Sequence, residues 1–67
     1  MSIPRVRIEN WKFFRFAGER RMTGQVYGHP QFRDGETVYT SIVRYRRGNT
    51  VRTFNTLYSL GVPANAS

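Results

Sequence analysis

The sequence predicts a small all-β domain, and three observations support this prediction. β-branched and aromatic residues are frequent, and short stretches alternate between apolar and polar positions. Six glycines divide the chain at intervals that suit hairpins. An amphipathic helix over residues 9–17 is the helical alternative, and the consecutive aromatic residues there favour a strand. We therefore expect a small curled antiparallel sheet or barrel of about five strands.

The first strand is expected over residues 3–16. Val6 and Ile8 alternate there with arginines, as in a strand with one face in the core. The Glu9-Asn10 pair breaks this alternation. We expect a β-bulge or bend at the pair, which would let the long strand serve two sheets of a small curled barrel.

The remaining strands are expected at residues 20–27, 36–46, 50–54 and 57–60, separated by turns rich in glycine. In the second strand, Val26 is expected in the core together with Met22. In the third strand, Ile42 is expected in the core together with Val38 and Thr40. Closure of the sheet would give the domain SH3-like or OB-like character and would remove exposed strand edges.

The chain has 67 residues, which allows one domain with a thin core. We expect residues 1–61 to form a single β domain and residues 62–67 to form a flexible C-terminal tail. Chains of this size usually need a disulfide, a metal or a partner subunit for stability. The chain has no cysteine, and its one histidine, His29, has no acidic residues clustered with it at metal-ligand spacing. A homo-oligomer without a metal site is therefore expected.

The residue types and their spacing do not favour an enzyme. The sequence has no cysteine nucleophile, no glycine-rich phosphate loop and no pair of carboxylates at catalytic spacing. Ser41 or Ser59 could join His29 and Asp34 in a triad, but no segment resembles a nucleophile elbow or an oxyanion loop. We expect a binding protein that needs no cofactor.

The charge of the chain predicts an anionic partner. The formal net charge is +7, and ten of the eleven basic residues are arginine, whose planar group matches phosphate. The chain also has ten aromatic residues, more than a core of this size can enclose. Exposed rings beside arginines suit a ligand that carries both bases and phosphates. The alternatives are a merely soluble basic surface and rings that fill the core or an oligomer interface.

The candidate ligand-binding residues combine these types near loops and strand ends. They are Tyr27, His29, Phe32, Arg33, Thr40, Ser41, Arg44, Tyr45, Arg46, Arg52, Thr53 and Asn55. Arg44 and Arg46 are two residues apart on one strand and point the same way, so with Arg52 on the next strand they are candidates for a phosphate clamp. For His29, the alternative is a turn histidine that is hydrogen-bonded to the backbone.

Residues 24–61 resemble short proteins encoded by bacteriophages and prophages. The resemblance lies in the pattern Tyr-Gly-His-Pro, Phe-x-Asp-Gly, Thr-Ser-Ile, a Thr-Phe-Asn corner and Tyr-x-Leu-Gly, which covers a little over half of the chain. Among such proteins are anti-defence sponges that sequester the cyclic nucleotide signals of Thoeris or CBASS immunity. The resemblance implies an oligomer with pockets lined by arginine, aromatic and small polar residues.

Sequestration of a phosphate-bearing nucleotide is thus the first functional hypothesis. A small basic β-barrel that binds nucleic acid is the second. An inhibitor directed at a protein, or a structural phage component, is the third. No apolar run reaches the roughly 18 residues of a membrane span, and no secretory signal opens the chain, so we expect a cytoplasmic protein without a membrane partner, in the host cell if a phage encodes it.

Overall fold

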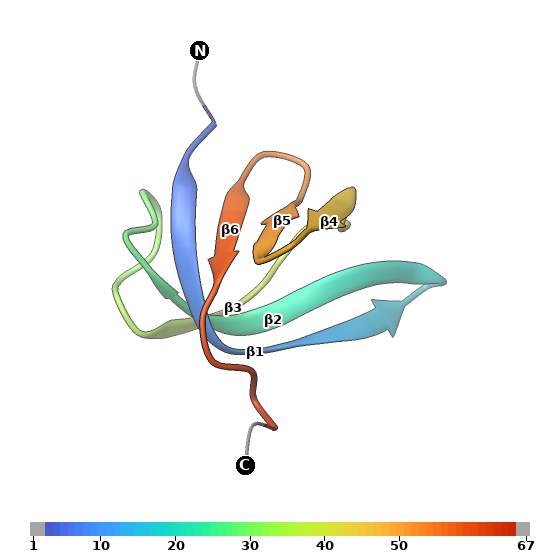
Figure 1. Cartoon of the computed structure of the whole chain (residues 1–67), viewed down its shortest axis with the longest axis horizontal. Helices are drawn as coiled ribbons and strands as arrows, with labels where there is room; N and C mark the ends of the chain where they lie inside the picture. Colours follow the sequence, from blue (N-terminus) through green and yellow to red (C-terminus); the bar gives the residue numbers. More distant parts are fainter. Residues whose placement is uncertain (1–2, 66–67) are drawn as a thin grey trace.

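The computed structural model describes residues 3–65, which form one mixed sheet and no helix (Figure 1). The strands are β1 (Arg5–Phe16), β2 (Glu19–Tyr27), β3 (Glu36–Tyr39), β4 (Tyr45–Arg47), β5 (Thr50–Arg52) and β6 (Leu57–Leu60). Their order in the sheet is β3-β2-β1-β6-β5-β4. The predicted all-β class is confirmed. Because the described chain has no helix, it has none that could cross a membrane.

The sheet differs from the prediction in its strand pairing. β1 and β6 are parallel, whereas every other neighbouring pair is antiparallel. The sheet has six strands rather than five, and it is not closed into a barrel, since β3 and β4 remain its two edges. Parallel pairing of the first and last strands joins two segments that no short turn could bring together.

The predicted bulge in the first strand is confirmed. The register between β1 and β2 shifts between Glu9 and Lys12, and Asn10 has a positive φ of 54°. Asparagine tolerates this left-handed conformation better than most residues. Figure 1 shows β1 and β2 bending together, so the long strand turns within one sheet and does not pass between two sheets.

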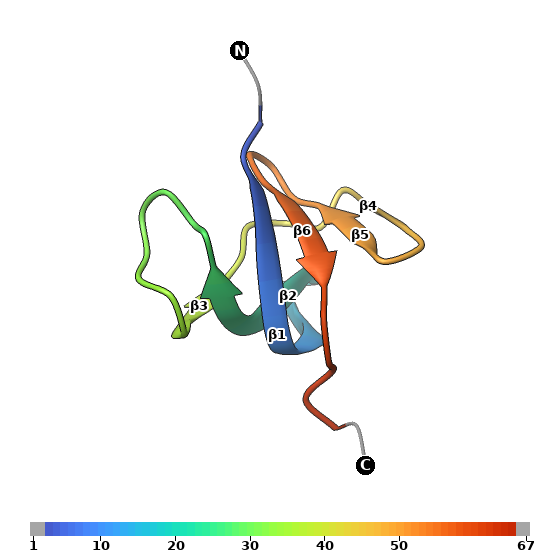
Figure 2. The ribbon, with the colours of Figure 1, turned by 60° about the vertical axis from the view of Figure 1, so that its left-hand side comes forward.

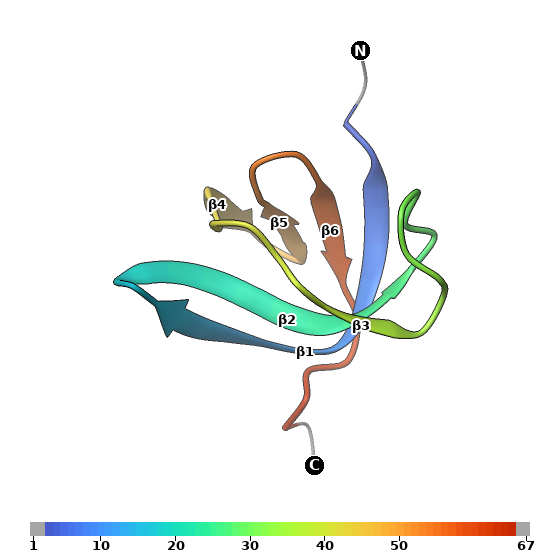
Figure 3. The ribbon, with the colours of Figure 1, turned by 180° about the vertical axis from the view of Figure 1, so that it is seen from behind.

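The predicted third strand, residues 36–46, is interrupted. β3 ends at Tyr39 and β4 begins at Tyr45, and the segment between them crosses behind the sheet (Figure 3). Its backbone N–H groups bond to both sides of the fold, because Val43 donates to the carbonyl of Arg20 on β2 at 2.8 Å and Arg44 donates to that of Arg52 on β5 at 2.7 Å. This crossing segment, residues 40–44, links the two halves of the curled sheet.

The crossing segment overturns one predicted core position. Ile42 is 38% exposed, so its assignment to the core is wrong, and Val43 packs against the core instead. The strand alternation stops at residue 40, because regular pairing with β2 ends there and the chain crosses to β5, which it reaches at Arg44. Val38 and Thr40, the other two residues of the predicted face, are buried as expected.

The core lies on the concave side of the curled sheet. Its buried apolar side chains are Val6, Ile8, Met22, Val26, Val38, Val51 and Tyr58. Trp11 and Phe13 are half-buried and pack against this group. The thin core expected for a chain of this length is therefore present.

The segment after β6 continues along β1. Asn10 donates its backbone N–H to the carbonyl of Val62 at 2.7 Å, and Ala64 donates to the carbonyl of Trp11 at 2.8 Å. Figure 2 shows this segment leaving the end of β6 beside the bend of β1. Residues 66–67 of the predicted tail lie outside the described residues, and the flexibility of residues 62–65 stays a prediction.

Candidate functional site

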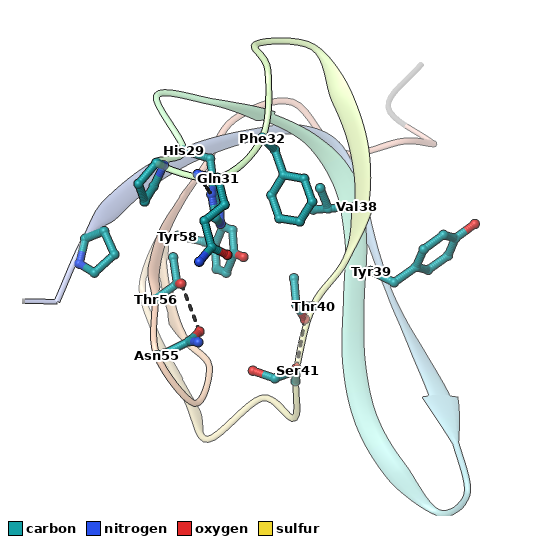
Figure 4. Close-up of a pocket in the computed structure, with 12 residues that line it drawn as sticks. His29, Gln31, Phe32, Val38, Tyr39, Thr40, Ser41, Asn55, Thr56 and Tyr58 are labelled. Atoms are coloured by element: carbon teal, nitrogen blue, oxygen red, sulfur yellow. Dashed lines mark hydrogen bonds between the residues drawn. The ribbon is translucent and has the colours of Figure 1, made fainter.

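A cavity of about 230 Å³ opens beside β3 and β6 (Figure 4). It lies among the loop after β2, the start of the crossing segment and the corner before β6. Its lining residues are Pro4, His29, Pro30, Gln31, Phe32, Val38, Tyr39, Thr40, Ser41, Asn55, Thr56 and Tyr58. None of these is an arginine, lysine, aspartate or glutamate, so we call the cavity the neutral pocket.

The loop that forms one wall of the neutral pocket is held by its own ends. The carboxylate of Asp34 accepts a hydrogen bond from the backbone N–H of Gly28 at 2.8 Å, and Gly35 donates its backbone N–H to the carbonyl of Val26 at 2.7 Å. Gly28 and Gly35 have φ values of 79° and 86°, which side chains with a Cβ rarely adopt. This closure directs His29 and Phe32 toward the pocket (Figure 4).

His29 is fixed in one tautomer. Its Nδ1 accepts a hydrogen bond from the backbone N–H of Gln31 at 3.0 Å, so the proton of the neutral ring lies on Nε2. Burial lowers the pKa of His29 from its ordinary value of 6.5, which keeps the ring uncharged near neutrality. The ring packs edge-on against Phe32 with centroids 4.7 Å apart. His29 is therefore both a turn histidine and a wall of the pocket that can donate one hydrogen bond.

Ser41 and Asn55 supply further donors from two different segments. The Oγ of Ser41 accepts a hydrogen bond from the backbone N–H of Phe54 at 3.0 Å, which leaves its own hydroxyl proton available. The hydroxyl of Thr56 donates to the Oδ1 of Asn55 at 3.1 Å (Figure 4). Because this bond uses the oxygen of the Asn55 amide, its NH₂ group remains available as a donor. By contrast, the hydroxyl of Thr40 is fully occupied, since it accepts from Met22 at 3.1 Å and donates to the carbonyl of Ser41 at 2.8 Å.

Tyr58 forms the buried floor of the pocket. Its position in β6 lies between Val6 of β1 and Val51 of β5 in register, and only 4% of the residue is exposed. Burial raises the pKa of its phenol, and a hydrogen bond with Thr56 offsets part of this effect. The phenol therefore stays protonated near neutrality. Tyr58, Phe32 and two prolines give the pocket flat walls.

The structure brings together five of the twelve predicted ligand-binding residues. His29, Phe32, Thr40, Ser41 and Asn55 line the neutral pocket, although up to 26 positions separate them, from 29 to 55. The other seven lie elsewhere, namely Tyr27, Arg33, Arg44, Tyr45, Arg46, Arg52 and Thr53. Sequence reasoning did not name the other seven lining residues, among them Gln31 and Tyr58. Gln31 lies between two predicted contacts, which was a usable signal, whereas the alternation of β6 marks Tyr58 only as a core residue.

The predicted arginine clamp does not converge. Arg46 pairs with Val51, whose side chain is in the core, whereas Arg52 pairs with Tyr45. Residues directly opposite in an antiparallel pair share a face, so Arg46 and Arg52 point to opposite sides of the sheet. The Nε of Arg52 donates to the carbonyl of Thr53 at 2.9 Å, and the guanidinium of Arg44 lies 5.9 Å from the ring of Phe54.

Two other side chains that were predicted to contact the ligand instead interact with neighbouring residues. The ring of Tyr27 lies 4.4 Å from the guanidinium carbon of Arg7. The hydroxyl of Thr53 is buried and donates to the carbonyl of Thr56 at 3.3 Å. Both side chains stabilise the fold beside the pocket and do not line it.

A metal centre finds no support within residues 3–65, because no three histidine or acidic side chains come together there. The chain gives no match to protein-family models, to curated proteins or to solved structures. Several of the sequence motifs within residues 24–61 share a location in the fold. His29, Phe32, Thr40 with Ser41, and Asn55 come from four of those motifs and line the neutral pocket.

Proposed function

We propose that the protein is a non-enzymatic binding protein that captures a nucleotide by its base in the neutral pocket. The observation that carries this proposal is the uncharged lining in a chain of net charge +7. A site for a phosphate would contain arginine, which the chain has in excess. A site without charges suits the flat, neutral part of a nucleotide, which offers ring faces and hydrogen-bonding edges.

The size and donors of the pocket support a base. A cavity of about 230 Å³ is smaller than the roughly 300–1,000 Å³ of sites that enclose drug-sized ligands, so it favours one ring system over a whole nucleotide. Phe32 and Tyr58 supply faces for the ring, and His29, Ser41 and Asn55 supply donors for its edge. The sugar and phosphate would then lie outside the cavity, where the positive field of the protein attracts them.

A role in sequestration agrees with how the candidate triad is used. Asp34 binds the backbone N–H of Gly28, and Ser41 binds that of Phe54, so each holds a loop in place. The resemblance to phage-encoded proteins further supports a cyclic nucleotide immune signal as the ligand, bound in the cytoplasm of a host cell.

Self-association belongs to the same proposal. Phe16 and Tyr39 are 65% and 73% exposed, and although Tyr39 is one of the residues that line the pocket, its ring points away from the other side chains there (Figure 4). Exposed rings of this size are frequent in interfaces between subunits. Native mass spectrometry of the purified protein tests this part, with a dimer or larger assembly expected, and the same spectrum reports any bound nucleotide.

Isothermal titration calorimetry with nucleosides, nucleotides and cyclic nucleotides tests the binding itself. We expect a nucleoside to retain most of the affinity of its nucleotide, since the base supplies the contacts. Asn55→Ala should weaken binding by about tenfold, as expected when one hydrogen bond of about 1.4 kcal/mol is lost. Arg52→Ala, which removes a charge outside the pocket, serves as the matched control and should bind with at most a small loss. Binding that requires the phosphate, and that is lost in Arg52→Ala but kept in Asn55→Ala, would overturn the proposal.

A further inference from the structure

A second cavity has the opposite chemistry and lies at the far end of the β1–β2 hairpin. It measures about 270 Å³ and is lined by Phe13, Phe14, Arg15 and Arg20. Arg46 of β4 reaches the same place, because its guanidinium carbon lies 5.9 Å from the ring of Phe13. We call these five residues the arginine cleft. None of them lines the neutral pocket.

Rings and guanidinium groups alternate in the arginine cleft and at Trp11 beside it. The guanidinium carbon of Arg20 lies 4.1 Å from the centre of the Phe13 ring, and that of Arg46 lies 5.6 Å from the ring of Trp11. Trp11 meets Phe13 edge-on at 5.6 Å, and its indole N–H donates to the carbonyl of Gly61 at 2.9 Å. The rings are therefore fixed, and the arginines lie over them at distances typical of cation–π contacts.

The arginines of the cleft repel one another in the free protein. Arg15 and Arg20 are direct partners in the β1–β2 register, so both side chains leave the same face of the sheet. Like charges at directly opposite positions destabilise an antiparallel pair. An anion bound between the two guanidinium groups would remove this repulsion, since it would contact both.

The described part of the chain has no carboxylate in the arginine cleft that could serve as this anion. Each acidic side chain already binds a partner elsewhere, at the bulge for Glu9, beside Arg21 for Glu19, and within the loop after β2 for Asp34 and Glu36. The Nε of Arg46 donates to the carbonyl of Gly48 at 3.0 Å, so this bond leaves the two terminal nitrogens available for an anion. An anion between these arginines would therefore come from a bound molecule.

We propose that the arginine cleft binds single-stranded nucleic acid. Arg15, Arg20 and Arg46 would hold phosphates of the backbone, and unpaired bases would stack on Trp11 and Phe13. Charge alone would also attract a duplex or an acidic protein, but ring faces beside guanidinium groups match unpaired bases in particular. The cleft is accessible to an extended strand, since β6 and the segment after it pair with β1 only as far as Trp11, and residues 12–16 of β1 pair with β2 alone among the described residues.

Fluorescence anisotropy of a labelled oligothymidine tests this proposal. The variants Arg15→Gln, Arg20→Gln and Arg46→Gln should each weaken binding about three- to tenfold and reduce the salt slope by about one. Arg5→Gln and Arg33→Gln remove the same charge outside the cleft and are the matched controls. They should change the affinity less than twofold. Equal losses in the cleft and control variants would overturn the proposal, because they would reflect the net charge alone.

Trp11 provides an independent readout, since it is the only tryptophan of the chain. Stacking of a base on this indole should quench its fluorescence as the oligonucleotide saturates the protein. No change in fluorescence at saturation, or tighter binding of a duplex or an acidic peptide at the same salt concentration, would also overturn the proposal. The variant Asn55→Ala separates the two sites, because it should bind the oligonucleotide like the unmodified protein even if the neutral pocket binds nothing.

Discussion

The carboxylate of Glu9 accepts a hydrogen bond from the backbone N–H of Val62 at 2.7 Å, which ties the bulge of β1 to the segment after β6. Arg7 donates to the same carboxylate at 3.2 Å. We expect Glu9→Ala to lower the free energy of unfolding by about 1–2 kcal/mol, because a charged acceptor is lost at a half-buried site. Glu9→Gln keeps an acceptor and should cost less. Urea unfolding gives both values, and faster hydrogen exchange at Val62 in Glu9→Ala would locate the effect.

The turn between β1 and β2 offers a stabilising substitution. Ala17 and Gly18 both have positive φ, at 55° and 77°, as a two-residue type I′ hairpin turn requires. Alanine is strained there, whereas Asn-Gly is the preferred pair. We expect Ala17→Asn to raise the free energy of unfolding by about 0.5–1 kcal/mol and Ala17→Val to lower it. Urea unfolding measures both variants, and a lower free energy of unfolding for Ala17→Asn than for the unmodified protein would contradict this account of the turn.

Val26 and Ile42 were both expected in the core, but truncation to alanine should destabilise the protein by different amounts. Val26 is fully buried, so Val26→Ala should cost about 2 kcal/mol. Ile42 lies on the crossing segment and is partly exposed, so Ile42→Ala should cost about 0.5 kcal/mol or less. Urea midpoints of the two variants measured side by side test this difference, and equal losses would place Ile42 back in the core.

Gly24 is required where β2 passes the bend of β1. A Cβ there would lie 2.7 Å from the Cγ1 of Ile8 and 2.9 Å from the carbonyl oxygen of Glu9. The backbone oxygen cannot move aside without disturbing the strand, so we expect Gly24→Ala to destabilise the fold by about 1–3 kcal/mol. Thr37→Ala, at an exposed position of β3, is the control and should stay within about 0.5 kcal/mol of the unmodified protein in thermal unfolding.

His29 should make stability depend on pH. Its pKa is lowered by burial, so the unfolded chain takes up a proton at a higher pH than the folded chain does. The free energy of unfolding should therefore fall as the pH decreases from 6.5 through the lower pKa of the folded state. This part of the pH dependence should be absent in His29→Gln. Urea titrations of both proteins between pH 5 and pH 8 measure the difference, and parallel curves would contradict the prediction.

Much of the fold could be predicted, because strand periodicity is a local property of the sequence. The alternation around Val6 and Ile8, its break at Glu9-Asn10 and the buried position of Val26 all follow from neighbouring residues. The crossing segment could not be predicted in this way. Its residues are as β-prone as those of a strand, and the chain leaves the sheet there because of hydrogen bonds to two distant strands.

The candidate site could likewise be predicted only in part. Residue type and position along the sequence identified His29 and Ser41, whereas the face on which each arginine lies depends on strand register. Arg15 and Arg20 were not among the predicted ligand contacts, since only the pairing of β1 with β2 makes them neighbours across the sheet. The chemical types were thus predictable from the sequence, and their convergence was not.

The parallel pairing of β1 with β6 also constrains how the protein is made. Residues 5–8 of β1 pair with residues 57–60, so this pairing cannot form until the chain has been synthesised as far as residue 60. Contacts between such distant segments form late, because closing a long loop costs entropy before the pairing repays it. The hairpin of β1 and β2 can form as soon as it leaves the ribosome. By contrast, β6 can join the sheet only after nearly the whole of this sequence has been synthesised.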